Sequence, residues 1–326
     1  MENILEFIKK IPVLVEDSRI ILFIIDGLGK YKLSILGFRK VTYETVIPTS
    51  TSTFMYTLHS LLPPSKHCFL EWYMRFRDTI VAVPPWRDVI HDRVLELDKD
   101  VTREEVFPFK SLSEILVEKG FTVTYYTPYA RSTFSKAISV GANVVDIKYL
   151  SQVFPLRESD FTLIYWPSID AILHERYEDE AFYIELKMIE YFIELLLRKL
   201  PKNTKLYILP DHGLIKCKHV YRLPVIDNVV PVGGSRVAFY KNLDPDTVEK
   251  ILKDKNIPAK ITLLENLKQY HNPNRECYER YGETIVIANG DVCFKYPFEK
   301  EEHKILGAHG GISEKERKIN LWVYTC

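Results

Sequence analysis

The stretch RIILFIIDGLG, residues 19–29, decides the fold class of this chain. It is an unbroken apolar run that ends in Asp26 and Gly27. A run of this kind is typical of a strand that is buried on both faces of a parallel sheet. The same pattern recurs three times, as FTVTYY at 121–126, FTLIYW at 161–166 and KLYILPDHG at 205–213. We therefore predict a central sheet that is mostly parallel.

Helical patterns separate these strands, first in residues 111–120 and then in the long amphipathic stretch 179–200. Strands that alternate with helices predict an α/β fold in which helices flank the sheet. We expect residues 1–326 to form one such domain. Within it, residues 216–300 predict a smaller α+β subdomain. Residues 63–108, rich in Pro, Trp, Arg and Asp, predict an irregular insertion near the functional site.

The composition limits the classes of partner. The 326 residues include 44 basic and 44 acidic side chains, so the net charge is zero. This balance gives no long-range attraction to a nucleic-acid polymer or an anionic membrane. No apolar run reaches the roughly 18 residues of a membrane span, and the first residues lack the apolar segment of a signal peptide. We expect a cytoplasmic protein whose partner is a small molecule.

The five cysteines are odd in number and widely spaced, and no two of them form a CxxC pair. Disulfide-rich domains and zinc knuckles both show closely spaced cysteines. The sequence therefore predicts neither a disulfide framework nor a cysteine zinc site.

Acidic and histidine side chains stand where the predicted strands end. Asp26 closes the first strand, and Asp211 and His212 close another. Ligands of open α/β sheets bind beyond the carboxyl ends of the strands, so these residues are expected at the functional site. Asp170 and His174 follow a third strand and are four residues apart. On a helix they would share one face and could bind one ion.

A further candidate is His309 in GAHGGIS, where the neighbouring glycines allow a close approach of the backbone. Each candidate also has a simpler interpretation when it is taken alone. Asp-Gly after a strand is commonly a turn, Asp170 could cap a helix, and the histidines could be ordinary surface or loop residues. An adjacent Asp and His at a strand end is more specific, because both are common metal ligands.

The segment PTSTSTF, residues 48–54, places five hydroxyl side chains in a row after a proline. Such a cluster could be a solvated loop, a helix cap or the seat of a nucleophile. The choice among these depends on what the rest of the chain brings close to it.

The order of the motifs adds information that no single motif holds. From about residue 20 to residue 316 the chain resembles the alkaline phosphatase superfamily, and most closely its type I phosphodiesterase/nucleotide pyrophosphatase branch. The segments that carry the resemblance are IIDGLG, PTSTSTF with the following LLPPSKH, DAILH, LPDHG and GAHGG. The resemblance implies an alkaline phosphatase-like fold and a phosphoester hydrolase.

The resemblance also implies two divalent metal ions, with Zn²⁺ as the expected metal. One ion would be held by Asp170, His174 and His309. The other would be held by Asp26, Asp211 and His212 together with the hydroxyl of Thr51. All seven positions are present in this chain.

Thr51 is the nucleophile that the resemblance implies. A threonine hydroxyl is a weak nucleophile at neutral pH and needs a metal to stabilise its alkoxide. Thr51 also opens a predicted helix, whose free N–H groups would meet a phosphoryl group. The expected function is hydrolysis of phosphodiester or pyrophosphate bonds in nucleotide-like small molecules through a Thr51 phosphoenzyme.

Other functions of the same superfamily stay open. A phosphomonoesterase or a phosphonate hydrolase would use a similar metal core. A sulfatase is disfavoured, because the C/S-x-P-x-R motif is absent after Pro48. An inactive scaffold that only binds a partner would be expected to have lost a metal ligand.

The segment FLEWYMRF, residues 69–76, follows the nucleophile helix and is a candidate substrate pocket. Trp72, Tyr73 and Phe76 could stack on a base, and Arg75 could meet a phosphate. The alternative is an amphipathic packing segment. His59 and His67 are expected to be structural. The oligomeric state is not indicated by the sequence.

Overall fold

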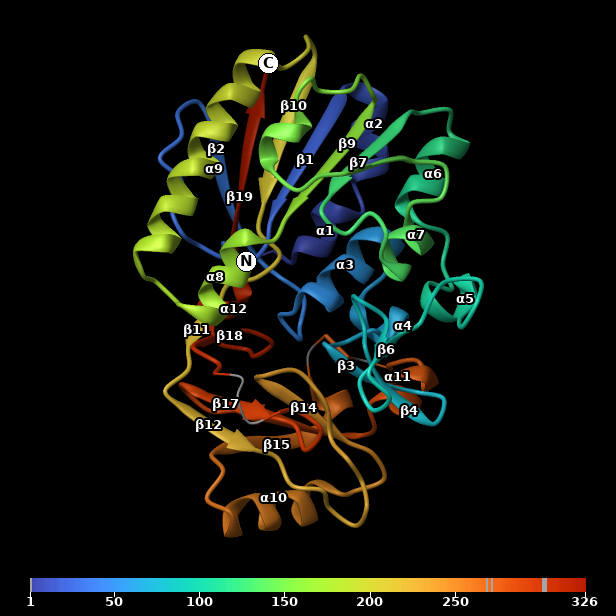
Figure 1. The fold of residues 1–326 in the computed structure, drawn as a ribbon, viewed down its shortest axis with the longest axis vertical. Helices are drawn as coiled ribbons and strands as arrows, with labels where there is room; N and C mark the ends of the chain where they lie inside the picture. Colours follow the sequence, from blue (N-terminus) through green and yellow to red (C-terminus); the bar gives the residue numbers. More distant parts are fainter. Residues whose placement is uncertain (1, 268, 271, 301–303) are drawn as a thin grey trace.

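The computed structural model of this chain describes residues 2–267, 269–270, 272–300 and 304–326. A large sheet covered by helices forms one end of the molecule, and several small sheets form the other (Figure 1). None of the helices in the described ranges could span a bilayer.

The large sheet has seven strands in the order β2-β19-β10-β1-β9-β7-β8. Five of them, β10, β1, β9, β7 and β8, are neighbours that run parallel. β19 is antiparallel to both β10 and β2. The prediction of a mostly parallel central sheet flanked by helices is confirmed. The strand bounds are β1 Arg19–Ile25, β2 Arg39–Glu44, β7 Val123–Thr127, β8 Asn143–Asp146, β9 Phe161–Trp166, β10 Thr204–Leu209 and β19 Lys318–Thr325.

Alternate side chains of β1 enter two different cores, which explains its unbroken apolar run. Leu22 and Ile24 pack with the helices on one face of the sheet. Phe23 and Ile25 pack with the helices on the other face. The first set is α1 (Ile4–Ile8), α2 (Ile11–Asp17), α3 (Thr51–Ser60) and α6 (Leu112–Glu118), and the second is α8 (Ser168–Glu175) and α9 (Glu180–Lys199).

β1 is also the point at which the strand order reverses. It pairs with β9 on one side and with β10 on the other. The carboxyl ends of these three parallel strands therefore lie together at one edge of the sheet, which is where ligands of such sheets bind. The helix α3 begins at the same edge (Figure 1).

Residues 63–108 are more regular than the sequence indicates. They form a four-stranded antiparallel sheet in the order β3-β4-β5-β6, between two short helices. The strands are only two to four residues long, which is too short for a periodic pattern to show in the sequence. The elements are α4 (Pro64–His67), β3 (Tyr73–Phe76), β4 (Thr79–Ala82), β5 (Arg87–Asp88), β6 (Arg93–Val94) and α5 (Arg103–Val106).

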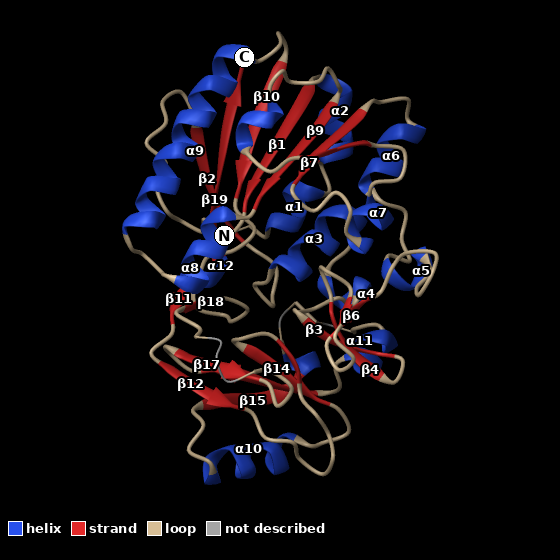
Figure 2. Ribbon diagram, in the orientation of Figure 1, coloured by secondary structure: helices blue, strands red, loops and turns tan. Residues whose placement is uncertain are grey.

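Residues 216–300 form the lower part of Figure 2, where short strands and helices alternate. A four-stranded antiparallel sheet, β13-β14-β16-β15, packs against α10, and β12 pairs in parallel with β17. These elements are β12 (His219–Arg222), β13 (Val232–Gly233), β14 (Val237–Tyr240), α10 (Pro245–Asp254), β15 (Ala259–Leu263), α11 (Arg275–Arg280), β16 (Thr284–Ala288) and β17 (Val292–Lys295). The remaining elements are α7 (Thr133–Ile138), β11 (Ile215–Lys216), β18 (Gly307–Ala308), α12 (Glu314–Arg317) and the 3-10 turns Leu150–Val153 and Leu264–Asn266.

Four of the five cysteines are paired, so the prediction of a chain without disulfides is wrong. Cys68 bonds Cys277 across a separation of 209 residues, and Cys217 bonds Cys293 across 76 residues. Cys326 is free and exposed. The prediction relied on the wide spacing of the cysteines along the sequence, but the fold brings distant segments together.

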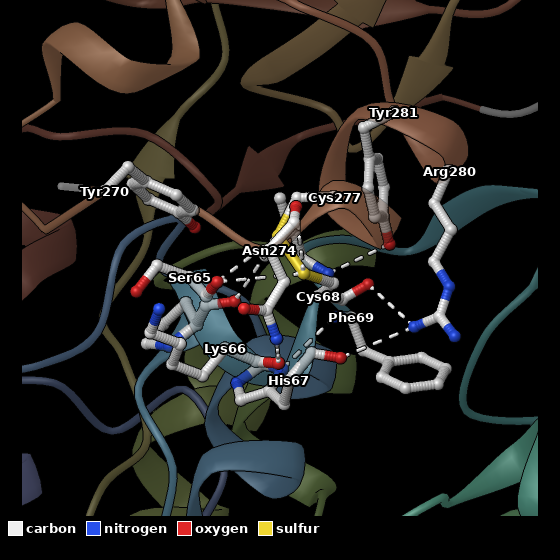
Figure 3. Close-up of a disulfide and its surroundings, with 12 residues drawn as sticks. Ser65, Lys66, His67, Cys68, Phe69, Tyr270, Asn274, Cys277, Arg280 and Tyr281 are labelled. Carbon is white, nitrogen blue, oxygen red and sulfur yellow. Dashed lines mark hydrogen bonds between the residues drawn. A yellow bond between two sulfur atoms is a disulfide. The ribbon is translucent and has the colours of Figure 1, made fainter. Parts of the chain in front are cut away.

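The Cys68–Cys277 bond joins the end of α4 to α11 (Figure 3). Arg280 donates to the carbonyl of Cys68 at 3.1 Å and lies over the ring of Phe69. The hydroxyl of Tyr281 accepts from the backbone of Leu70 at 2.9 Å.

Disulfides are rare in reducing compartments of mesophilic cells. The cytoplasmic location stays a prediction, and it would place these two bonds in a reducing environment.

The cysteine pairing gives a first testable prediction. Alkylation of the denatured protein without reductant should label Cys326 alone, and alkylation after reduction should label all five cysteines. Mass spectrometry of the intact chain counts the labels. More than one label before reduction would contradict the pairing.

Candidate metal centre and nucleophile

The hydroxyl cluster at the start of α3 divides into separate roles. Ser50 is the cap of the helix, and its side chain accepts from the backbone of Thr53 at 3.3 Å. Thr49 donates its hydroxyl to the carbonyl of Gly311, and Thr53 donates to the carbonyl of Leu70. These three side chains are therefore engaged in hydrogen bonds that fix the local backbone.

Thr51 is the hydroxyl that meets the acidic and histidine residues. It is the first residue of α3 and is partly buried. Its Oγ1 lies 3.3 Å from each carboxylate oxygen of Asp26 and 3.0 Å from Nε2 of His212. The structure therefore brings the candidate nucleophile within hydrogen-bond distance of two candidate metal ligands.

Close packing of the backbone brings Asp26 to Asp170. The N–H of Asp170 donates to the carbonyl of Asp26 at 3.1 Å. Gly27 follows with a φ of +73°, and a Cβ built there would lie 2.9 Å from Cα of Asp170. A glycine is required at this position, because any other side chain would push the turn after β1 away from α8.

Asp170, His174 and His309 form one group of potential metal ligands. Nε2 of His174 lies 3.3 Å from Oδ2 of Asp170, and Nε2 of His309 lies 3.8 Å from Oδ1. Each histidine donates its Nδ1 proton to a backbone carbonyl, His174 to Gly307 at 2.8 Å and His309 to Thr49 at 3.0 Å. These bonds engage Nδ1 of each ring, so Nε2 is the nitrogen that faces Asp170 and could bind a metal.

A second group consists of Asp26, Asp170 and His212. The sequence assigned Asp170 to the first ion only, whereas its carboxylate lies in both groups. Nε2 of His212 is 3.4 Å from Asp26 and 3.3 Å from Oδ2 of Asp211. Asp211 is thus beside this group, and its other oxygen accepts from the backbone of Gly27 and of His212.

The buried acids repel one another. Burial raises the pKa of Asp26 well above its usual value, and the charges of Asp211 and Asp170 raise it further. Burial likewise raises the pKa of Asp211 to about 6. Burial opposes ionisation of Asp170 too, but the charge and hydrogen bond of His174, together with the two other histidines of the centre, outweigh burial and hold the pKa of that carboxyl well below its usual range.

The three imidazoles differ in charge. Burial disfavours the protonated ring of His174, but the charge of Asp170 and the hydrogen bonds of the ring outweigh burial and raise the pKa of His174. The other two imidazoles add little positive charge. Burial lowers the pKa of His212 to about 4 and that of His309 to about 3. Their rings stack with centroids 3.8 Å apart, an arrangement that suits two neutral rings. The centre therefore holds three buried acids with too little positive charge to balance them. Bound divalent cations would supply that charge.

Three buried atoms of the centre lack a hydrogen-bond partner among the described residues: Oδ1 of Asp170, Oδ2 of Asp211 and Nδ1 of His212. An unpaired buried acceptor is costly unless a ligand satisfies it. Carboxylate oxygens and imidazole nitrogens are the donors that zinc prefers together. The residues present therefore fit a pair of divalent metal ions.

Only part of the predicted pocket segment, residues 69–76, lines a cavity in the structure. A cavity of about 490 Å³ opens beside Thr51, and Trp72 and Tyr73 line it. Arg75 instead donates to the carbonyls of Tyr281 and Val230, and the ring of Phe76 packs edge-on against Trp86. The strand advances about 3.3 Å per residue, so it carries its later residues away from the cavity.

Two further residues of the site were not found from the sequence. Tyr165 donates its hydroxyl to Asp26. It lies at the end of β9, directly beside Ile24 of β1, and a hydroxyl at the end of an apolar run was the available signal. Glu71 is buried in the cavity wall, and one of its oxygens accepts from the backbone of Trp72 at 3.1 Å. Nothing in the local sequence pattern marked it.

Comparison with known proteins agrees with this geometry. The sequence matches the family described as type I phosphodiesterase / nucleotide pyrophosphatase over residues 37–312. Asp26 lies just before the matched range, yet the structure places it against Thr51. No curated protein matches the sequence.

Several solved structures share the fold. Murine ectonucleotide pyrophosphatase / phosphodiesterase 5 superposes with a TM-score of 0.68 at 17% identity, over 94% of this chain and 88% of that chain. The human protein of the same name gives a TM-score of 0.66 at 17% identity, over 94% and 87%. An inactive threonine-to-alanine form of the murine protein, in complex with AMP, gives 0.65 at 16% identity, over 94% and 87%. At these identities the likeness establishes the fold.

The shared position of Asp170 leads to a prediction about metal content. Because Asp170 lies in both ligand groups, Asp170→Asn should lose both zinc ions, whereas His174→Ala should lose one. Zinc per chain is measured by plasma mass spectrometry after loading and desalting. Asp146→Asn, in β8, is the matched control and should bind like the unaltered protein. One retained zinc in Asp170→Asn would show that the two groups do not share this carboxylate.

Proposed function

Because the chain belongs to the type I phosphodiesterase/nucleotide pyrophosphatase family, we propose that it hydrolyses phosphodiester or pyrophosphate bonds of nucleotide-like small molecules. Thr51 is the nucleophile in this proposal, and two zinc ions are the cofactors. The main observation that supports this proposal is the position of Thr51 Oγ1, which lies at the start of α3 between Asp26 and His212.

The acids and histidines already described would hold the metals. When bound, the ions would lower the pKa of the Thr51 hydroxyl and offset the charge of the phosphoryl oxygens. In the chain itself, the Thr51 hydroxyl donates towards Asp26. Asp26 is fixed in turn by the hydroxyl of Tyr165. These contacts hold Thr51 Oγ1 at the carboxyl edge of the sheet, ready to attack phosphorus.

The reaction would then take two steps. Thr51 Oγ1 forms a bond to phosphorus as the bond to the leaving alcohol or phosphate breaks, and the leaving group takes up a proton. Water then attacks the phosphorus of the Thr51 phosphoester and restores the hydroxyl. The N-terminus of α3 faces this position, and its free N–H groups would stabilise the phosphoryl oxygens.

A nucleotide-like substrate is supported by one structural relative. The murine protein in complex with AMP is an inactive threonine-to-alanine form. A loss of activity on removal of a threonine hydroxyl is the behaviour expected of a threonine nucleophile. In the present chain the cavity beside Thr51 has a volume of about 490 Å³, which lies within the range of small-molecule sites.

Substitution of Thr51 tests the nucleophile. Thr51→Ala should lower kcat by several orders of magnitude while the fold and both metals are kept, since Ser50 and not Thr51 caps the helix. Thr51→Ser should retain substantial activity because it keeps the hydroxyl. Ser50→Ala is the neighbouring control, with a stability loss of about 1 kcal/mol and little change in kcat.

Two outcomes would contradict this role of Thr51. If Ser50→Ala abolished turnover and Thr51→Ala did not, the nucleophile would be the preceding residue. If both variants stayed active, water rather than a side chain would attack phosphorus. Steady-state kinetics with one chromogenic diester distinguishes these cases.

The substrate class gives a further prediction. We expect a higher kcat/KM for the p-nitrophenyl ester of thymidine monophosphate, a diester, than for p-nitrophenyl phosphate. The comparison is made with zinc-loaded protein, and p-nitrophenylphosphonate serves as the third substrate. A clear preference for the monoester or the phosphonate would instead support the phosphomonoesterase or phosphonate hydrolase alternative.

A further inference from the structure

The cavity beside Thr51 continues into the protein along one side of α3. Ser52, Met55, Tyr56 and His59 all line it. Their spacing of three, four and seven residues places them on one face of the helix. From Thr51 to His59 the helix rises about 12 Å. We call this extension, from Ser52 to His59, the inner arm of the cavity.

Sheet and helix residues close the other side of the inner arm. Tyr125 of β7, Leu163 of β9, and Phe134 and Ile138 of α7 line the same cavity. Within the described residues, α3, β7 and α7 contribute no charged side chain to the lining. The charged lining residues come from other segments, namely Asp26, Glu71, Asp170, Lys295 and Glu299. The arm is therefore suited to a neutral, mostly apolar group.

His59 lies at the far end of the inner arm, and the environment of its ring is unusual. Its side chain is fully buried, and neither ring nitrogen has a hydrogen-bond partner among the described residues. The ring makes edge contacts with Tyr125 and Phe134, at centroid distances of 5.5 and 6.2 Å. Burial lowers the pKa of His59 to about 3, so the neutral ring offers one donor and one acceptor.

His67 shows what a structural histidine looks like in this protein. It is equally buried, but Nε2 pairs with the hydroxyl of Thr57 at 3.0 Å and Nδ1 accepts from the backbone of Phe69 at 3.1 Å. The sequence predicted a structural role for both histidines. His67 has the hydrogen bonds of such a role, and His59 lacks them.

Two more polar atoms of the inner arm lack a hydrogen bond in good geometry within the part of the chain that the structure describes. These are the hydroxyls of Ser52 and Tyr125, both of which are buried. Ser113 lies near the Tyr125 hydroxyl and slightly offsets the effect of burial, which raises the pKa of that phenol. An unsatisfied buried polar group destabilises the folded state. A molecule that enters the arm and bonds to these groups would recover that free energy.

From these observations we infer that the inner arm binds one ester group of the substrate and selects a neutral, mostly apolar group that carries a hydroxyl or amide at its far end. His59 is the main recognition residue at that end, and Tyr125 and Ser52 add to it. The inference rests on the proposed function for the position of phosphorus at Thr51. An arm filled only by water is the competing explanation, because a polar cavity of this size can hold water.

Three phosphodiesters of p-nitrophenol test the inference. Their second ester group is methyl, nonyl or ω-hydroxyoctyl, and the two long chains have the same number of heavy atoms. The unaltered protein should show a kcat/KM at least about tenfold higher for the hydroxyoctyl ester than for the nonyl ester. The methyl ester reports the chemistry common to all three, so each value is expressed relative to it.

Replacement of His59 tests the recognition residue. His59→Phe keeps an aromatic ring and removes both nitrogens, so it should abolish or reverse the preference for the hydroxyoctyl ester. Its Tm should equal or exceed that of the unaltered protein, because two unpaired buried nitrogens are removed. Tyr183→Phe, at an exposed position on α9, is the control and should keep the preference.

A binding experiment separates failure of this inference from failure of the proposed function. Calorimetric titration of the metal-free protein with hexanol should give tighter binding than titration with 1-fluorohexane, which has the same number of heavy atoms and no hydroxyl, and His59→Phe should remove the difference. If no ester is hydrolysed but this difference is seen, the proposed function fails and the inference about the inner arm is supported. If the unaltered protein discriminates neither the esters nor the two hexyl compounds, or if His59→Phe keeps the preference, the inference is overturned.

Discussion

The repulsion among three buried carboxylates is the constraint on which the rest of this structure depends. Asp26, Asp170 and Asp211 meet at the carboxyl edge of the sheet, and the pKa values of Asp26 and Asp211 are raised by burial and by neighbouring negative charge. His174 offsets part of the charge of Asp170, whereas His212 and His309 are buried in a neutral form and compensate little. The folded chain can accept this arrangement because the apolar strands that lead to it are buried on both faces of the sheet. The free energy of that burial outweighs the repulsion.

Much of this arrangement can be predicted from the sequence, because it depends on features that are local. The apolar run of β1 and its closing Asp26 are contiguous, and the parallel strands bring Asp26 and Asp211 to one edge by the geometry of the sheet alone. The order of the motifs along the chain then indicates the family to which the chain belongs. The sharing of Asp170 between two ligand groups could not be predicted, since it depends on the close backbone contact at Gly27.

The features that were not predicted from the sequence all depend on contacts between distant segments. Cys68 and Cys277 are 209 residues apart, and only the fold shows that they meet. The departure of Arg75 from the cavity follows from its bonds to Val230 and Tyr281, which no local pattern contains. The sequence context of His59 is that of a core residue. What distinguishes His59 is that neither ring nitrogen has a hydrogen-bond partner among the described residues, and a sequence cannot show this.

The central claim is that this edge of the sheet holds two metal ions beside Thr51, and anomalous diffraction tests it most directly. Crystals grown with zinc would be measured on both sides of the zinc absorption edge. The account predicts two anomalous peaks about 4 Å apart, one bounded by Asp170, His174 and His309 and the other by Asp26, His212 and Thr51, with the Asp170 carboxylate reaching towards both. A single peak, or two peaks remote from Thr51, would contradict it.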